Sequence, residues 1–182
     1  MLGVSFALRP SELSEPIRYA ELARRLGVRV GDDVPLADAR AAVLGLRRAK
    51  GMVVDPADPD SVSAGSFFTN PVLAADAFAA LERRVAERLG DGVAPPAFPA
   101  ADGHVKTSAA WLIERAGFHR GQGDPHGIAI SSKHTLALTN RGAGTTADLV
   151  SLAREIARGV HDRFGVDLVP EPVFVGHAWP GA

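Results

Sequence analysis

A short segment with one glycine, Ser-Ala-Gly-Ser-Phe-Phe-Thr-Asn-Pro at residues 63–71, carries side chains that could act on a ligand. Gly65 allows the backbone a positive φ or a close approach to a ligand. If the two following phenylalanines anchor the segment in a core, Ser66 and Asn70 could present a hydroxyl and an amide to one ligand. The alternative is a common glycine turn that leads into a helix, with a Ser or Asn cap. The segment lacks the Gly-x-Ser-x-Gly elbow of hydrolases, since residue 68 is Phe.

Three other candidate residues lie elsewhere along the chain. Glu171 stands between two prolines, where a solvated carboxylate is the ordinary alternative to a buried functional one. Lys50 ends a predicted helix, where its charge either compensates the helix dipole or binds a phosphate. His134 falls between two predicted strands, a common place for a surface histidine. Four further histidines have no metal-ligand spacing to one another, so no metal site is predicted: His104, His126, His161 and His177.

Composition narrows the class of protein. The 182 residues are 46% hydrophobic and 23% charged, with a net charge of -1, so no overall basic field favours nucleic acid or an anionic membrane. The absence of cysteine excludes disulfides, thiolate catalysis and Cys-ligated metals. No signal-peptide pattern and no apolar run of about 20 residues is found. We expect a soluble cytoplasmic protein without nucleic-acid, membrane or metal partners.

The elements that must position these side chains mix helix and strand, which predicts an α+β fold. Apolar residues alternate over 4–8, the pattern of a strand. Two prolines interrupt a last predicted strand over 168–175, which suits an edge strand. Residues 55–63 are rich in Asp, Pro and Ser and mark a linker. Helices are predicted over 16–26, 36–50, 73–89, 106–116 and 146–164, and a hairpin or bulged strand over 128–131 and 135–140.

Two of the predicted helices have a well-defined apolar face. The helix over 73–89 places four apolar residues on one stripe: Phe78, Leu81, Val85 and Leu89. The helix over 146–164 follows Thr145, with Asp148 three residues later in a capping-box arrangement. Its expected buried face consists of Leu149, Leu152, Ile156, Val160 and Phe164.

Residues 63–71 resemble the signature segment of the UDP-N-acetylenolpyruvoylglucosamine reductases (UDP-N-acetylmuramate dehydrogenases). Four further segments are similar in order along the chain: 46–55 with Lys50-Gly51-Met52, 105–114, 132–140 and Val-Pro-Glu-Pro-Val at 169–173. The resemblance covers essentially the whole chain. It implies that residues 1–55 are the C-terminal remnant of an FAD-binding domain with a junction helix. It also implies that 56–168 form a substrate-binding domain and that 169–182 return a catalytic glutamate to the flavin.

The resemblance implies a two-step reaction in peptidoglycan synthesis. NADPH reduces FAD, and the reduced flavin gives hydride to UDP-N-acetylglucosamine enolpyruvate, which becomes UDP-N-acetylmuramate. The same resemblance makes Ser66 the proton donor and Glu171, in its protonated form, a stabiliser of the enolate-like intermediate. Lys50 and Asn70 are then contacts of the substrate diphosphate, and His134 lies near the substrate.

The chain departs from the family pattern in two ways. His119 and Arg120 stand where relatives often carry Lys-Gly, which alters the charge of that loop. The glycines at 117, 121 and 123 follow a predicted helix rather than open one, so they are not a dinucleotide fingerprint. We therefore expect an N-terminally truncated chain that retains little FAD and is inactive alone. Two alternatives stay open: a non-redox UDP-sugar-binding module, and an α+β domain with a structural or interaction role.

Overall fold

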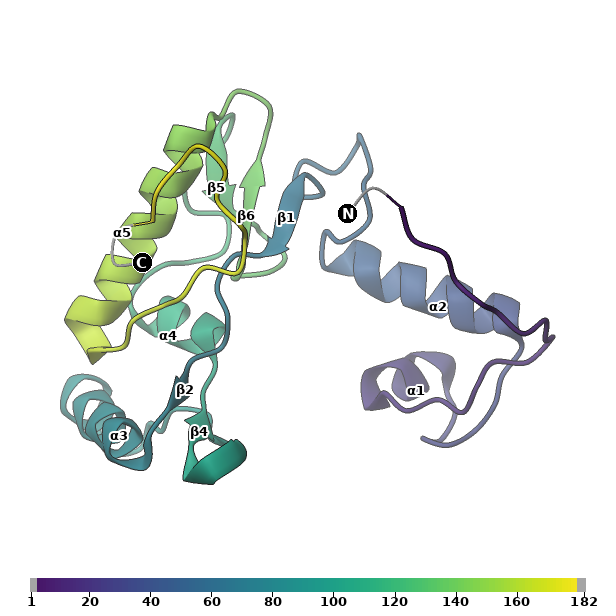
Figure 1. Ribbon diagram of the computed structural model, residues 1–182, viewed down its shortest axis with the longest axis horizontal. Coiled ribbons are helices and arrows are strands. Elements are labelled where there is room, and N and C mark those ends of the chain that lie inside the picture. Colours follow the sequence, from purple (N-terminus) through teal and green to yellow (C-terminus); the bar gives the residue numbers. More distant parts are fainter. Residues whose placement is uncertain (1–2, 180–182) are drawn as a thin grey trace. The chain divides into compact units, whose positions relative to one another are not determined.

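The computed structural model describes residues 3–179, and the chain divides into an N-terminal unit, Met1–Val53, and a C-terminal unit, Val54–Ala182 (Figure 1). The N-terminal unit contains helices α1 (Ala20–Leu26) and α2 (Leu36–Ala49). Helix α1 ends at Gly27, whose φ of 72° is the left-handed conformation that closes many helices. A small core holds the unit together, formed by Ile17, Ala23, Val34 and Ala39.

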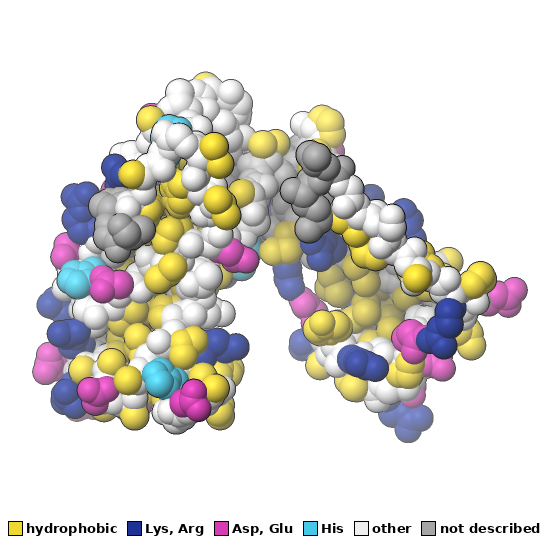
Figure 2. Space-filling model, viewed as in Figure 1, with side chains coloured by type: hydrophobic (Ala, Val, Ile, Leu, Met, Phe, Trp, Pro, Cys, Tyr) yellow, Lys and Arg dark blue, Asp and Glu magenta, His cyan; other side chains and the backbone are white. Residues whose placement is uncertain are grey.

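The strand predicted over residues 4–8 is not formed. The alternation is present, but no described strand pairs with this segment, and pairing is what stabilises an extended backbone. Val4, Phe6 and Leu8 are consequently 59%, 78% and 84% exposed. Figure 2 shows many hydrophobic side chains on the visible surface of this unit.

The C-terminal unit contains an antiparallel sheet of three strands in the order β1-β6-β5. Strands β5 (Ile128–Ile130) and β6 (Ala137–Asn140) form the predicted hairpin, with Ile128 opposite Asn140. Strand β1 (Ser63–Ser66) adds to the other side of β6. The sequence did not predict β1 as a strand, because a run of Ser, Ala and Gly has no apolar alternation.

A second sheet of very short strands has the order β2-β4-β3. Its strands are β2 (Val72–Leu73), β3 (Phe98–Pro99) and β4 (Val105–Lys106). A short 3-10 turn, η1 (Ala101–Gly103), lies between β3 and β4. Helices α3 (Ala75–Leu89) and α4 (Ala109–Arg115) begin directly after β2 and β4. The predicted helices over 73–89 and 106–116 therefore began too early, because their first residues pair across this sheet.

Helix α5 (Thr146–Phe164) has the predicted bounds, and the capping box between Thr145 and Asp148 is confirmed. It packs against β5 and β6 and contacts α3 and α4 (Figure 1). Its buried face is turned slightly from the predicted one, since Leu149 and Leu152 are only half-buried. The buried residues of α5 are Val150, Ala153, Ile156, Val160 and Phe164. From α3, the predicted Phe78, Leu81 and Val85 complete the core, with Leu89 half-buried.

The chain after α5 runs back along this unit without forming the predicted strand over 168–175. One isolated bridge joins Pro170 to Phe68. Proline has no N–H to donate, so the two prolines of the segment limit pairing to the residues around that bridge. The observed fold is thus α+β, and no helix in residues 3–179 is both long and apolar enough to cross a membrane.

Candidate functional site

Ser66 lies at a β-bulge that ends strand β1. Ser63 is opposite Thr139 and Ser66 is opposite Ala137, so β1 advances three residues where β6 advances two. Gly65 lies within this irregularity with a φ of 84°, a conformation that favours glycine. Of the two possibilities that the sequence left open at Gly65, the structure has the positive φ. A bulge of this kind redirects the side chain that follows it, here the half-buried Ser66.

The two phenylalanines after Ser66 anchor the bulge. Phe67 and Phe68 are 3% and 2% exposed, and their rings meet edge to face at 5.1 Å. The Phe67 amide donates to the Leu136 carbonyl at 2.7 Å, which continues the pairing with the β6 side of the sheet. The expectation that both rings lie in a core is confirmed, and it fixes the backbone on the C-terminal side of Ser66.

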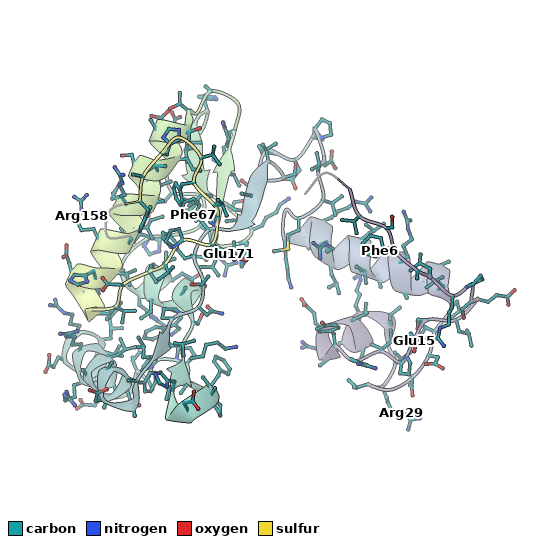
Figure 3. All side chains as sticks on the ribbon, in the orientation of Figure 1. Phe6, Glu15, Arg29, Phe67, Arg158 and Glu171 are labelled. Carbon is teal, nitrogen blue, oxygen red and sulfur yellow. The ribbon has the colours of Figure 1, made fainter. Side chains whose placement is uncertain are left out.

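Glu171 is brought beside this segment by the chain that follows α5. The Glu171 amide donates to the Phe67 carbonyl at 2.8 Å, and the Thr69 amide donates to the Val169 carbonyl at 3.0 Å. Figure 3 shows Phe67 and Glu171 close to each other. Glu171 is thus hydrogen-bonded through its backbone to Phe67, the residue that directly follows Ser66, although the two segments are distant in sequence. The Glu171 side chain is exposed.

Aromatic residues of the C-terminal segment pack on the same anchor. Phe174 and Trp179 lie 6.3 Å from the Phe67 ring, and Trp179 lies 6.2 Å from Phe68. Such pairs stabilise by about 0.5–1.5 kcal/mol each beyond the area that they bury. The segment that carries Glu171 is therefore held to the Ser66 segment both by backbone hydrogen bonds and by ring contacts.

Asn70 has a structural contact that limits what its side chain can bind. Its Oδ1 accepts a hydrogen bond from the Ala109 amide at 2.9 Å, at the first turn of α4. The side-chain oxygen is therefore occupied, while the amide nitrogen makes no hydrogen bond within the described residues. The alternative prediction, in which Ser or Asn caps the helix after residue 71, does not hold for α3, whose Ala74 cap uses no side chain.

Lys50 and His134 lie in different units. Lys50 follows α2 in the N-terminal unit, and its Nζ pairs with Glu21 Oε2 at 2.8 Å. His134 is half-buried between β5 and β6, where its amide donates to Ser131 Oγ at 3.3 Å. In the loop that departs from the family pattern, Arg120 Nε lies 3.4 Å from Glu114 Oε1. The substrate contacts expected of Lys50 and His134 stay predictions.

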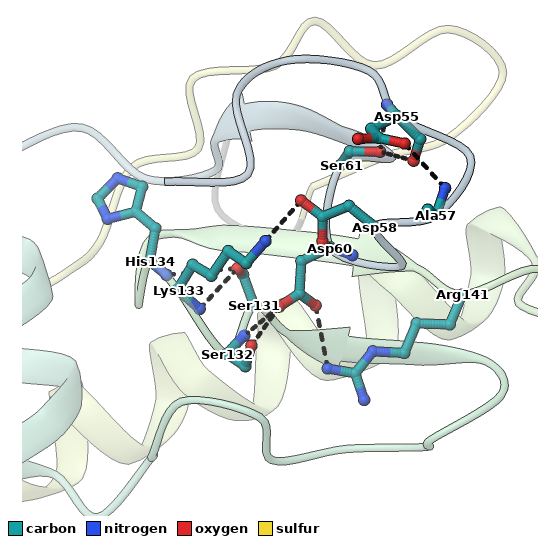
Figure 4. A network of polar contacts seen from close by, with 10 residues as sticks. All are labelled: Asp55, Ala57, Asp58, Asp60, Ser61, Ser131, Ser132, Lys133, His134 and Arg141. Atoms are coloured by element: carbon teal, nitrogen blue, oxygen red, sulfur yellow. Dashed lines mark hydrogen bonds and ion pairs between the residues drawn. The ribbon is translucent and has the colours of Figure 1, made fainter. Parts of the chain in front are cut away.

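A buried polar network lies beside the sheet (Figure 4). Asp60 is 3% exposed, and its Oδ2 accepts hydrogen bonds from the Ser132 hydroxyl and from the Ser132 amide at 2.9 Å. Arg141 Nη2 lies 3.1 Å from Asp60 Oδ1. Burial opposes ionisation, but the hydrogen bonds from Ser132 and Arg141 and the Arg141 charge outweigh it, so the pKa of Asp60 is lowered from its ordinary value. Beside it, Lys133 Nζ pairs with Asp58 Oδ2 at 2.6 Å.

Sequence reasoning missed this network. Its members come from the predicted linker 55–63 and from the residues around β6, and no motif joins them. The usable signal was the Asp-Pro-Asp-Ser run at 58–61, because short acidic side chains often accept backbone hydrogen bonds in turns.

A groove of about 830 Å³ lies between α5 and the segment that follows it. Its lining includes Arg158, Trp179, and the prolines at 170 and 172 on either side of Glu171. Neither Ser66 nor Glu171 belongs to that lining. The candidate pair therefore does not open into this groove, and Figure 3 labels Arg158 and Glu171 apart from each other.

We tested whether the described residues fit a dinucleotide such as FAD. The turn before α5 contains Gly142 and Gly144, but the N-terminus of that helix is occupied by its capping box. Hydrogen bonds from the Thr145 side chain and backbone lower the pKa of Asp148, so this position holds a carboxylate that repels phosphate. The glycine-containing turn before α5 thus offers no free helix N-terminus for a diphosphate. Among residues 3–179, no group of three or more His, Cys, Asp or Glu residues could hold a metal ion.

Comparison with known proteins identifies the family of this chain. The domain family described as "UDP-N-acetylenolpyruvoylglucosamine reductase, C-terminal domain" matches residues 56–175, which is more than half of the chain. Proteins named UDP-N-acetylenolpyruvoylglucosamine reductase are similar to this chain over nearly all of its length. The protein from Thermobifida fusca is 67% identical over 173 residues, which are 95% of this chain and 48% of the relative.

More distant relatives bear the same name. The protein from Streptomyces coelicolor is 62% identical over 179 residues, 98% of this chain and 46% of the relative. The protein from Mycobacterium ulcerans is 52% identical over 180 residues, 98% of this chain and 47% of the relative. The chain spans about half the length of the curated relatives that it matches. With the C-terminal domain matched and identities far above 30%, the chain belongs to the UDP-N-acetylenolpyruvoylglucosamine reductase family.

Proposed function

We propose that this chain forms the substrate-side part of a reductase that converts UDP-N-acetylglucosamine enolpyruvate to UDP-N-acetylmuramate in peptidoglycan synthesis. Membership of the reductase family supports this proposal. The observation that carries it is the hydrogen bond of 2.8 Å between the Glu171 amide and the Phe67 carbonyl. It sets the backbone of residue 171 beside the segment that carries Ser66, which supports a site that both side chains share.

Reduction of the enolpyruvyl ether needs a hydride at one carbon and a proton at its neighbour. Ser66 is proposed to give that proton through Oγ. A serine hydroxyl is a weak acid, so it serves only against a strongly basic, enolate-like carbon within hydrogen-bond reach. The bulge at Gly65 and the buried Phe67 support this role because they fix the backbone on both sides of Ser66, and a well-positioned donor lowers the barrier to proton transfer.

Glu171 is proposed to stabilise the developing enolate by donating a hydrogen bond in its protonated form. The side chain is exposed in the described structure. A neutral carboxyl at neutral pH requires an environment with little water, which the bound substrate and the rest of the reductase would have to create. The backbone pairing around Pro170 supports the role, because it fixes the point from which the side chain reaches the substrate.

The resemblance implies FAD, reduced by NADPH, as the source of the hydride. The turn before α5 does not fit the FAD diphosphate, and the part of the reaction that we assign to this chain is substrate binding and proton transfer. Residues 1–55 are proposed to belong to the flavin-binding part of the whole reductase. The exposed apolar side chains of Val4, Phe6 and Leu8 support this assignment, because extended apolar segments of this kind usually pair with another sheet.

The substrate diphosphate is proposed to bind Lys50 and the amide nitrogen of Asn70, with His134 near the sugar or the enolpyruvyl group. Lys50 already pairs with Glu21, and the Asn70 oxygen already accepts from the α4 amide, which leaves the Asn70 nitrogen as the donor to phosphate. An exposed ion pair of this type contributes only about 0–1 kcal/mol, so Lys50 can exchange Glu21 for a phosphate at little cost.

A chimeric enzyme tests the proposal. This chain replaces the matching 173 residues of the Thermobifida fusca relative, to which it is 67% identical. We expect the chimera to bind FAD, to oxidise NADPH and to reduce the enolpyruvyl substrate. A folded, yellow chimera that consumes NADPH but never reduces the substrate contradicts the proposal.

The second candidate function is a UDP-sugar-binding module without a redox role. Calorimetry with UDP-N-acetylglucosamine on the 182-residue chain distinguishes it from a purely structural domain, because only a binding module releases heat at this ligand. If the chain binds the ligand tightly and the chimera is inactive, the two results together favour the binding module over the reductase.

A further inference from the structure

The loop before β1 is a folded structure rather than a free linker. The Ala57 amide donates to Asp55 Oδ1 at 2.9 Å, and the Asp60 amide donates to Asp58 Oδ1 at 3.1 Å. Ser61 Oγ donates to the Asp55 carbonyl at 2.9 Å. These short-range bonds form successive turns that leave Asp60 and Ser61 buried and aim the Asp60 carboxylate into the unit (Figure 4).

The Asp60 carboxylate contacts a residue of the loop that joins β5 to β6 and the residue that follows β6. Ser132 precedes β6 by a loop, and Arg141 directly follows β6. Asp60 Oδ2 accepts from the Ser132 amide and hydroxyl, and Arg141 Nη2 binds Oδ1 at 3.1 Å. A buried carboxylate with three such donors is held far more rigidly than an exposed pair, and loss of the carboxylate leaves the half-buried Arg141 guanidinium without its counter-charge.

Asp60 stands three residues before Ser63, the first residue of β1. The Asn140 amide donates to the Val62 carbonyl at 3.0 Å, so the intervening chain is already tied to β6. Strand β1 is thus fixed at its start by Asp60 and at its end by Phe67 and Phe68. Gly65, the flexible residue between these anchors, carries the bulge that aims Ser66.

We propose that Asp60 is a positioning residue for Ser66: through Ser132 and Arg141 it fixes the register of β1 on β6, and so the direction of the hydroxyl. Asp60 does not touch the substrate in this account. The inference rests on the proposed function only for its catalytic consequence, since the coupling of Asp60 to β1 can be measured on the chain itself.

Hydrogen exchange on the full 182-residue chain tests the coupling. Asp60→Asn should raise the exchange rate of the Phe67 and Asn140 amides about tenfold, because their hydrogen bonds, to the Leu136 and Val62 carbonyls, join the chain at the two ends of β1 to the β6 side of the sheet. Asp148→Asn is the matched control, since it removes another carboxylate with hydrogen bonds to a residue of the same unit, at the start of α5. Ser132→Ala is a milder second variant if Asp60→Asn fails to fold. Equal exchange at these amides in the Asp60 and Asp148 variants overturns the proposal.

Half-reactions of the chimera test the consequence. Asp60→Asn should slow reduction of the enolpyruvyl substrate about tenfold or more and leave flavin reduction by NADPH unchanged, since small misplacement of a catalytic group is costly. The KM for the substrate should change much less than the rate. Asp148→Asn should leave both half-reactions unchanged.

The two proposals fail in distinguishable ways. A Ser66→Ala chimera that still reduces the substrate at the normal rate refutes the proposed function. If Ser66→Ala is slow while Asp60→Asn matches Asp148→Asn in both half-reactions, the role of Ser66 stands and the positioning role of Asp60 is refuted.

Discussion

Replacement of Gly65 by alanine measures the free-energy cost of placing an L-residue at the positive φ of the bulge. Gly65 has a φ of 84°, and a Cβ built on it meets no atom within 4 Å. A steric clash therefore contributes nothing, and the whole cost comes from forcing an L-residue into the left-handed region. That cost is about 1–2 kcal/mol, and it exceeds the entropy that alanine removes from the unfolded chain.

The chain contains a convenient probe for this measurement. Both tryptophans, Trp111 and Trp179, belong to the C-terminal unit, so their fluorescence follows the unfolding of that unit alone. Urea titration of Gly65→Ala should show a free energy of unfolding lower by about 1–2 kcal/mol, and the Tm should fall by about 4–8 °C.

Gly92→Ala is the matched control, because Gly92 also has open space around its Cβ position and is not among the glycines with positive φ. It should leave the unfolding free energy within about 0.5 kcal/mol of the wild type. Equal stability of the Gly65 and Gly92 variants would refute the reasoning, since it would mean that the bulge does not require a positive φ.

Three further predictions concern charge, capping and packing. The lowered pKa of Asp60 means that its ionised form stabilises the unit above about pH 4 and that this stabilisation is lost as the pH falls. In urea titrations, the unfolding free energies of the wild type and of Asp60→Asn should therefore differ at about pH 6 and approach each other towards about pH 3. Asn70→Asp should keep the acceptor for the α4 amide, and with it stability, but weaken UDP-N-acetylglucosamine binding in calorimetry; Asn70→Ala should lose both, with about 1 kcal/mol of stability. Gly159→Ala places its Cβ 2.5 Å from the Phe118 ring and should destabilise by about 1–3 kcal/mol in thermal melts, whereas Gly45→Ala, 3.7 Å from the nearest atom, should stabilise its helix by up to about 1 kcal/mol.

Local patterns were sufficient for the elements whose signals lie within a few residues. Helix α5 begins and ends where Thr145, Asp148 and Gly165 predicted, because a capping box and a left-handed glycine act on their own turn. The hairpin of β5 and β6 likewise follows from two apolar runs joined by a short loop. The phenylalanines at 67 and 68 were correctly expected in the core.

Elements that depend on distant partners were not predictable in this way. Strand β1 has no alternation and exists because β6, more than 70 residues later, offers it an edge. The Asp60 carboxylate meets Ser132 and Arg141 across separations of 72 and 81 residues, which no local motif records. The opposite error occurred at residues 4–8, where alternation predicted a strand and no described partner forms one. Pairing, rather than propensity, decided each case.

The approach of Glu171 to the Ser66 segment was expected only from the family resemblance. By itself, the position of Glu171 between two prolines indicated a solvated carboxylate, and the side chain is indeed exposed. The structure adds the backbone pairing at Phe67 that no pattern around residue 171 could indicate. Their roles in catalysis stay predictions until the reaction itself is followed.

Stopped-flow absorbance on the chimera with Ser66→Ala follows that reaction most directly. Flavin bleaching on mixing with NADPH reports one half-reaction, and the return of yellow colour on mixing the reduced enzyme with the enolpyruvyl substrate reports the other. If the Ser66 hydroxyl gives the proton to the carbon next to the one that receives the hydride, its removal should slow only the second step, by a factor of about 100 or more. Equal slowing of both steps, or a second step at the wild-type rate, contradicts the assignment of proton transfer to Ser66.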